Sequence, residues 1–163
     1  SSKWCKSWMK IKSILFVLSF ILVFWIFIPN YLIDLNIIYG LPEYRYGFLN
    51  ALGYILIGIG VLINVNISYL FMKFGKGTPS ITEPTKKLVQ RGIYKYTRNP
   101  MYLSNTTIIL GIFCIYGHVL ILLYAAIFFK LMHLFLVFIE EPSNRKKFGK
   151  SYEKYLQEVP RWF

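Results

Sequence analysis

The residues best suited to chemistry lie in two stretches that are far apart in the chain. The first stretch ends in Arg98-Asn99-Pro100, where Asn99 is a favourable N-cap and Pro100 a favourable first helical residue. The free N–H groups at the start of that helix, with Arg98 beside them, could hold a carboxylate or a phosphate. An equally consistent interpretation is a capped helix whose arginine anchors in lipid headgroups.

The second stretch carries His133, Glu140 and Glu141 on an otherwise apolar segment. On a regular helix these three residues and Lys130 fall within an arc of about 100°. A polar stripe is costly in lipid and usually faces the interior of a bundle, so we interpret it as functional. Its carboxylates and imidazole could bind hydroxyl or ammonium groups, or take a proton from a reacting group.

The composition indicates that a membrane surrounds the elements that position these residues. Of the 163 residues, 56% are hydrophobic and 16% are charged, whereas soluble domains average about 25% charged residues. Two cysteines, Cys5 and Cys114, are too few for a disulfide scaffold or a cysteine-rich zinc module, and we expect no metal. In so apolar a chain, the net charge of +12 favours an anionic membrane surface over nucleic acid as a partner.

We predict an all-α fold: a polytopic membrane helical bundle with four transmembrane helices in one domain, 1–163. A helix needs about 20 apolar residues to cross the bilayer core. Apolar stretches supply spans at about residues 13–33, 46–72, 100–116 and 118–141, and the last of these carries Lys130 and ends in Glu140 and Glu141. A tight hairpin at Gly117-His118 joins the last two spans. Gly53, Gly58 and Gly60 resemble the small-residue contacts of membrane helices.

The chain after the fourth span predicts a separate amphipathic element. Pro142 is expected to break the helix, and residues 143–163 form a C-terminal amphipathic segment. Its apolar residues recur at helical spacing: Phe148, Tyr152, Tyr155 and Leu156. This segment could lie on the membrane or act as a lid over a site beneath it.

Charge sets the expected orientation of the spans. The N-terminus, the loop at residues 73–99 and the C-terminal tail are strongly basic, whereas the first loop is slightly acidic. By the positive-inside rule, we expect an integral membrane protein with both termini and the active site on the cytoplasmic side. Met9 could be the native start, which would make residues 1–8 a tag or linker remnant.

Two sequence patterns carry a family resemblance. Residues 87–102 read K-L-V-x-x-G-I-Y-x-Y-x-R-N-P-M-Y, and Glu-Glu-Pro at residues 140–142 is followed by F-G-x-x-Y-x-x-Y and V-P-R-W. In this order, the patterns are similar to those of the integral-membrane methyltransferases that include isoprenylcysteine carboxyl methyltransferase and phosphatidylethanolamine N-methyltransferase. The resemblance covers roughly residues 75–163. Better-known eukaryotic members have His where this chain has Asn99, which can hydrogen-bond but cannot titrate.

The resemblance implies S-adenosylmethionine as the methyl donor, bound by the cytoplasmic cofactor loop 73–99, the last two spans and the C-terminal segment. Ten matching positions should line the pocket: Lys87, Leu88, Val89, Tyr94, Arg98, Asn99, Pro100, Tyr102, Glu140 and Glu141. We expect Arg98 to hold the methionyl carboxylate, and Glu140 or Glu141 to bind the ribose or the ammonium. Leu88 and Val89, with Tyr94 or Tyr102, would flank the adenine.

The implied reaction leaves the acceptor open. Arg98, Glu141 and His133 are the catalytic candidates; a carboxylate acceptor needs no base, whereas an amine would need Glu141, His133 or a tyrosine. The expected acceptor is lipophilic: first an isoprenylcysteine-type carboxylate, then a phospholipid amine, then a small thiol. Two alternatives come from other classes, an NADPH-dependent enzyme resembling sterol reductases and a non-enzymatic membrane scaffold.

Overall fold

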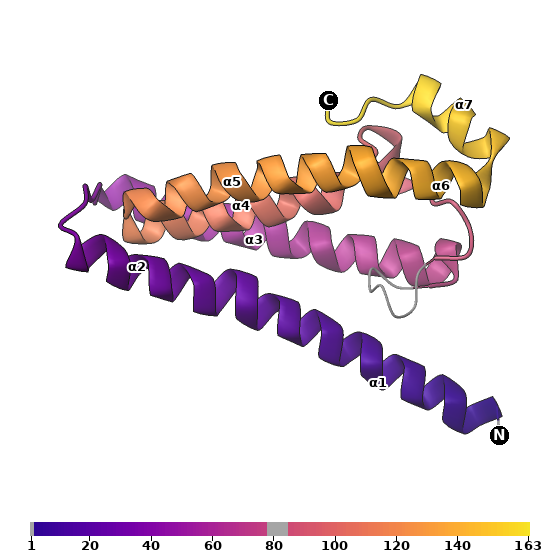
Figure 1. Ribbon diagram of the computed structural model, residues 1–163, viewed down its shortest axis with the longest axis horizontal. Helices are drawn as coiled ribbons and strands as arrows, with labels where there is room; N and C mark the ends of the chain where they lie inside the picture. The colour runs from indigo at the N-terminus through magenta and orange to yellow at the C-terminus, as the bar shows by residue number, and fades with distance from the viewer. Residues whose placement is uncertain (1, 78–84) are drawn as a thin grey trace.

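Helices form the architecture of this chain. The computed structural model describes residues 2–77 and 85–163, with side chains from residue 10 onward (Figure 1). In these ranges there is no strand, and the one isolated β-bridge pairs Glu43 with His118. The expected all-α class is therefore confirmed.

The N-terminal rod consists of α1 (Ser2–Phe20), the π-helical segment η1 (Ile21–Phe27) and α2 (Ile28–Ile38). Phe24 and Ile33 pack on the core of the bundle, and the Tyr124 hydroxyl donates to the Phe24 carbonyl at 2.8 Å. Figure 1 shows α1 diverging from the other helices toward its N-terminus. The rod is thus attached to the bundle mainly through its second half.

Small residues bring two antiparallel helices into close contact. These helices are α3 (Gly47–Leu70), which continues into the π-helical segment η2 (Phe71–Gly75), and α4 (Pro100–Tyr116). A Cβ on Gly53 would lie 2.6 Å from the Gly111 carbonyl, and one on Gly60 would lie 2.8 Å from the Ser104 carbonyl. Gly58 was expected to share this role, but its Cβ would meet nothing within 4 Å among the described residues. Gly58 therefore does not belong to the contact.

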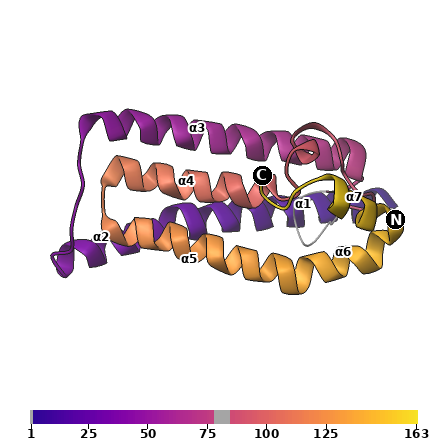
Figure 2. The ribbon, with the colours of Figure 1, turned by 90° about the horizontal axis from the view of Figure 1, so that it is seen from above.

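A left-handed turn joins α4 to α5 (Val119–Phe135). Gly117 has φ 73°, and a side chain there would collide with the Tyr44 backbone. The Tyr44 N–H donates to the Gly117 carbonyl at 2.8 Å, which fixes the hairpin against the first connection. Figure 2 shows α4 between α3 and α5, so its side chains are largely enclosed.

The helix that begins with α5 does not end where the sequence indicated. It continues through the π-helical segment η4 (Leu136–Glu140) into α6 (Glu141–Phe148), so the prediction that Pro142 breaks the chain is wrong. Pro142 occupies the first turn of α6, where its missing N–H costs no intrahelical bond. The π segment before it has already interrupted the regular i to i−4 hydrogen-bond ladder.

Among the described residues, three helices are long and apolar enough to cross a membrane: Lys10–Ile38, Gly47–Gly75 and Val119–Phe148. The fourth predicted span, α4, has 17 residues and is about 26 Å long, slightly less than the bilayer core of about 30 Å. Its length follows from Pro100 at one end and Gly117 at the other. The part of the chain that the structure describes is thus a helical membrane bundle with three long apolar helices and the shorter α4.

The C-terminal region is folded in two parts rather than as one amphipathic helix. Gly149, with φ 55°, separates α6 from α7 (Lys150–Glu158). Tyr152 and Tyr155 are buried in a cluster with Val159, against which Leu88 of the loop packs. Residues 159–163, which we call the C-terminal strap, follow α7 without regular structure.

The start of α1, the loop before α4 and α6–α7 lie toward one end of the bundle, and from there the chain runs back so that the C-terminus lies near the start of α4 (Figure 1). The Gly117 turn and the connection between α2 and α3 lie at the other end. We call these the site end and the hairpin end. The predicted site residues from both stretches therefore lie at the same end.

Candidate functional site

Two arginines bind Glu141: Arg98, which precedes it in the chain, and Arg161, which follows it. Arg161 donates from Nε to Oε1 at 2.9 Å and from Nη2 to Oε2 at 3.1 Å, and Arg98 donates from Nη1 to Oε1 at 3.3 Å. The side chains of Arg98 and Glu141 are only 10% and 8% exposed. A buried carboxylate is costly unless its lone pairs are satisfied, and this pairing satisfies them. The hydrogen bond to Glu141 raises the pKa of Arg161 above its usual value.

The C-terminal strap is bound to the segment that precedes α4. The Arg98 N–H donates to the Pro160 carbonyl at 3.1 Å, and Thr97 Oγ1 donates to the Arg161 carbonyl at 3.2 Å. Asn99 Nδ2 also donates to the Arg161 carbonyl, at 3.1 Å. The residue stands at the N-cap position, but its side chain makes no capping bond. Asn99 therefore stands at the predicted N-cap position, but the prediction that its side chain caps the helix is wrong, because the side chain binds the strap instead.

Glu140 faces a different partner from its neighbour. The Tyr102 hydroxyl on α4 donates a short hydrogen bond to Glu140 Oε2. Lys130, expected on the same polar stripe, is exposed instead. The π segment between Phe135 and Glu141 changes the angular spacing of side chains, so a regular 100° period fails there. Only the part of the stripe near the site end remains together.

His133 borders the same strap. Its ring lies 5.8 Å from the Trp162 ring, which also packs on Phe129 at 4.9 Å. Its Nδ1 is buried without a hydrogen-bond partner among the described residues. Because Arg161 and Trp162 are adjacent in sequence, the strap brings His133 and Glu141 to one region.

Two residues of this region were missing from the predicted site, Arg161 and Trp162. Both lie in the V-P-R-W pattern, which was recognised without a role for its members. No local pattern singles out Arg161 among the basic residues of the tail, since its partner Glu141 lies 20 residues earlier in the chain.

The tyrosines of the region are suited to donate rather than to accept protons. Burial raises the pKa of Tyr94 well above its usual value, with Glu140 adding to the shift. Burial also raises the pKa of Tyr152 and of Tyr155. The Tyr155 hydroxyl donates to the Tyr94 carbonyl at 2.7 Å, which ties α7 to the loop. These phenols remain protonated at neutral pH.

The structure does not bring all ten predicted cofactor positions together. Val89 and Tyr94 fill a buried cluster with Ile67 and Leu70, whereas Leu88 packs toward α7. Pro100 is buried in the first turn of α4. Lys87 is exposed at a hollow of about 660 Å³, which is lined by Phe74, Lys87, Leu88, Val89, Gln90, Arg91, Gly92 and Lys95. The loop thus presents a basic hollow beside, and separate from, the arginine–glutamate cluster.

The fold and this site define a membrane-embedded helical bundle with an arginine–glutamate cluster at one end. The chain belongs to the phospholipid methyltransferase family, whose model matches residues 48–151. The matched range contains the loop, Arg98, Tyr102 and both glutamates, but not the strap. No curated protein and no solved structure matches the chain. The match favours methyl transfer over the reductase and scaffold alternatives.

Proposed function

We propose that this protein transfers a methyl group from S-adenosylmethionine to a lipophilic acceptor in the membrane. The observation that carries the proposal is the cluster of Arg98, Glu141 and Arg161 in a chain of a methyltransferase family. The cluster lies where α4, α5–α6 and the strap meet at the site end. A polar donor from solution and an acceptor in the bilayer would both reach this end.

One polar atom in the cluster supports an anionic ligand. Arg98 Nε is buried without a hydrogen-bond partner among the described residues, although buried donors are nearly always paired. A carboxylate is the strongest partner for a guanidinium N–H. Arg98 would therefore hold the methionyl carboxylate of the donor, and Glu140 beside Tyr102 would bind its ribose hydroxyls or its ammonium.

S-adenosylmethionine, when bound, supplies a methyl group on a sulfonium for direct in-line displacement. The protein's own task is then to align the two reactants and to exclude water. Arg161 and Trp162 serve that task, because the strap covers the start of α4 and packs on α5. Glu141 positions both arginines, since its oxygens already accept three N–H bonds.

An isoprenylcysteine-type carboxylate is the acceptor that these residues suit best. It is ionised at neutral pH and needs no base, and neither Glu141 nor the protonated tyrosines can readily serve as one. A phospholipid amine is the second candidate, supported by the family description. His133 would then be the base, since its buried Nδ1 has no partner among the described residues.

Charge supports a cytoplasmic location for the site end. Basic residues of the loop and tail gather there, as the positive-inside rule requires. An anionic cytoplasmic leaflet would attract the same surface. Protease accessibility of the C-terminal strap in sealed right-side-out and inverted vesicles tests this orientation.

The decisive experiment is calorimetric titration of the purified protein with S-adenosylhomocysteine, with NADPH in parallel. We expect S-adenosylhomocysteine alone to bind, and Arg98→Ala and Glu140→Gln each to weaken its binding. Unchanged affinity in both variants would overturn the assigned site, and binding of NADPH instead would overturn the reaction. Methyl incorporation into farnesylcysteine and phosphatidylethanolamine then separates the two acceptors.

A further inference from the structure

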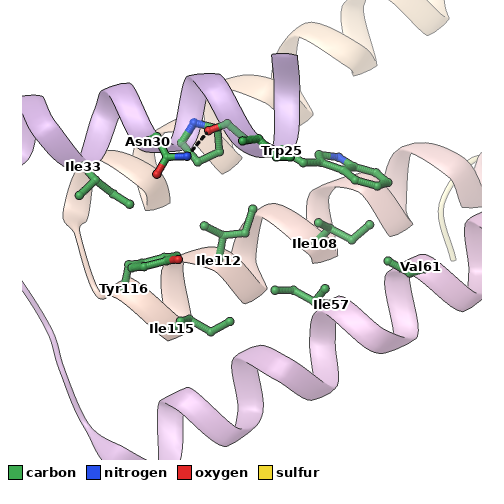
Figure 3. Close-up of a pocket in the computed structure, with 11 residues that line it drawn as sticks. Trp25, Asn30, Ile33, Ile57, Val61, Ile108, Ile112, Ile115 and Tyr116 are labelled. Carbon is green, nitrogen blue, oxygen red and sulfur yellow. Dashed lines mark hydrogen bonds between the residues drawn. The ribbon is translucent and has the colours of Figure 1, made fainter. Parts of the chain in front are cut away.

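Two hollows in the described part of the chain differ in their chemistry. Figure 3 shows one of them between the N-terminal rod, α3 and α4, where Trp25, Val61 and Ile112 are among the lining side chains and none is charged. The other is the basic hollow of about 660 Å³ at the site end. Its volume lies within the range of about 300–1,000 Å³ that ligand pockets occupy, and its charge indicates the kind of ligand.

Three cations line the basic hollow: Lys87, Arg91 and Lys95. All three side chains are exposed, and none of them forms an ion pair with a carboxylate among the described residues. The arginine–glutamate cluster is different, because its cations are already paired with Glu141. Unpaired cations around a hollow suit an anion, and a phosphate suits an arginine best, since the guanidinium can bind two of its oxygens at once.

The backbone and an aromatic ring fix the shape of this hollow. The N–H groups of Lys86 and Lys87 both donate to the Gly75 carbonyl, at 2.7 and 3.0 Å, and so hold the loop against the end of η2. The Arg91 guanidinium carbon lies 4.5 Å from the centre of the Phe74 ring, where a cation–π interaction orients it. The cations are therefore partly preorganised, which lowers the entropic cost of binding a ligand.

Backbone donors of the loop add to the positive charge. Leu88, Val89 and Gln90 also line the hollow, and their N–H groups make no hydrogen bond with a described residue. Successive backbone N–H groups make concave binding sites for anions, and such groups are nearly always paired when they are shielded from water. A ligand with several acceptor oxygens would therefore complete this loop.

The position of the hollow indicates a membrane lipid as the source of the phosphate. Phe74, which lines the hollow, belongs to the last turn of the apolar helix Gly47–Gly75. Just before it, Tyr69 is 48% exposed, and Lys73 Nζ donates to the Tyr69 hydroxyl oxygen at 2.7 Å. Tyrosine and lysine at the end of a span are typical of the headgroup region. The hollow therefore lies at the depth of the lipid phosphates.

We propose that the basic hollow binds the phosphate of one anionic phospholipid, with Arg91 and Lys95 contacting its oxygens. A basic surface attracts an anionic leaflet at any of its points, whereas this site holds a single headgroup at a fixed place. The inference goes beyond the proposed methyl transfer and does not depend on it.

Two pairs of cations in the same loop provide matched variants. Arg91→Gln/Lys95→Gln removes two charges from the hollow, whereas Lys76→Gln/Lys86→Gln removes two charges that do not line it. All four side chains are exposed, so both double variants should fold like the wild type. The measurement is native mass spectrometry of the detergent-purified protein, titrated with phosphatidylglycerol and, separately, with phosphatidylcholine.

We expect phosphatidylglycerol to bind at least about tenfold more tightly than phosphatidylcholine. Arg91→Gln/Lys95→Gln should lose this preference, and Lys76→Gln/Lys86→Gln should keep it. An equal loss in both double variants would show diffuse attraction and overturn the proposal, and so would a wild type without the preference. Competition by inorganic phosphate at the same concentration as the lipid would assign the hollow to a soluble anion, and would overturn the lipid assignment.

Calorimetry separates this hollow from the donor site. In detergent without anionic lipid, Arg91→Gln/Lys95→Gln should bind S-adenosylhomocysteine as tightly as the wild type does. A weaker affinity in this variant would place the hollow in the donor site and overturn the inference. If S-adenosylhomocysteine does not bind the wild type at all, the proposed function fails, and the preference for phosphatidylglycerol is still decided by its own measurement.

Discussion

Arg161 and Glu141 form a bidentate ion pair between the C-terminal strap and the helix that begins with α5. The two hydrogen bonds, of 2.9 and 3.1 Å, use both carboxylate oxygens. This planar geometry is specific to arginine, because lysine offers a single point charge. The pair explains how five residues without regular structure hold a fixed position over the start of α4.

Arg161→Ala should release the strap. Glu141 is 8% exposed and would lose two of its three N–H bonds, while the 35% exposure of Arg161 lets water replace part of the pair, so the free energy of unfolding should fall by about 1.5–3 kcal/mol. We also expect the affinity for S-adenosylhomocysteine to fall at least about tenfold, measured by calorimetry.

Arg161→Lys is the matched control for this variant. It keeps the charge and loses the bidentate geometry, so its affinity should lie between those of the wild type and Arg161→Ala. Equal affinity in all three proteins would show that the strap takes no part in donor binding.

The Tyr102–Glu140 hydrogen bond predicts a non-additive pair of substitutions. Tyr102→Phe removes the donor and leaves a half-buried carboxylate without it, which should cost about 1.5–3 kcal/mol of stability. Glu140→Gln keeps an acceptor for the hydroxyl and should cost less. The double variant should be more stable than the sum of the two single effects indicates, measured by thermal unfolding in detergent. Additive effects would mean that the two side chains do not interact in the folded protein.

The sequence indicated which residues meet at the site end, but not every bond between them. The spacing of charges and apolar runs was enough for the helices and the hairpin at Gly117, and it predicted the same side of the membrane for Arg98 and Glu141. Their meeting in one site was implied by the family resemblance. The course of the chain around Glu140 and beyond it could not be predicted from that spacing. The π segment before Glu141 depends on tertiary packing, and so does the continuation of the helix past Pro142. The hydrogen bond from the Asn99 side chain to the strap joins residues that are 62 positions apart, and local capping preference cannot reveal such a partner.

The contact between α3 and α4 predicts opposite effects for two similar glycines. Gly53→Ala places a Cβ 2.6 Å from both the Gly111 carbonyl and Ile115 Cγ1, so the helices must separate. We expect a loss of about 1–3 kcal/mol, as for other overpacked interiors. Gly58→Ala meets no described atom within 4 Å and should stabilise the helix by about 0.5–1 kcal/mol. Thermal unfolding in the same detergent measures both, and equal melting temperatures would contradict the contact.

His133 distinguishes the two acceptor chemistries. The residue packs against Trp162 and has a buried Nδ1 without a partner among the described residues, so it can accept a proton if the acceptor is an amine. For a carboxylate acceptor no proton is released, and His133→Asn should keep kcat within about twofold for farnesylcysteine. For phosphatidylethanolamine, the same variant should lose at least about tenfold in kcat.

The dependence of the rate on pH is a second test of whether the acceptor is an amine or a carboxylate. An amine must give up its proton before it can attack the methyl group, so amine methylation falls as the pH is lowered from about 8 to 6. Carboxylate methylation should stay flat there, because the acceptor is ionised throughout. We expect the flat profile and the small effect of His133→Asn together. A rate that falls with decreasing pH in the wild type, together with a large loss of kcat in His133→Asn, would instead assign the protein to the phospholipid amines.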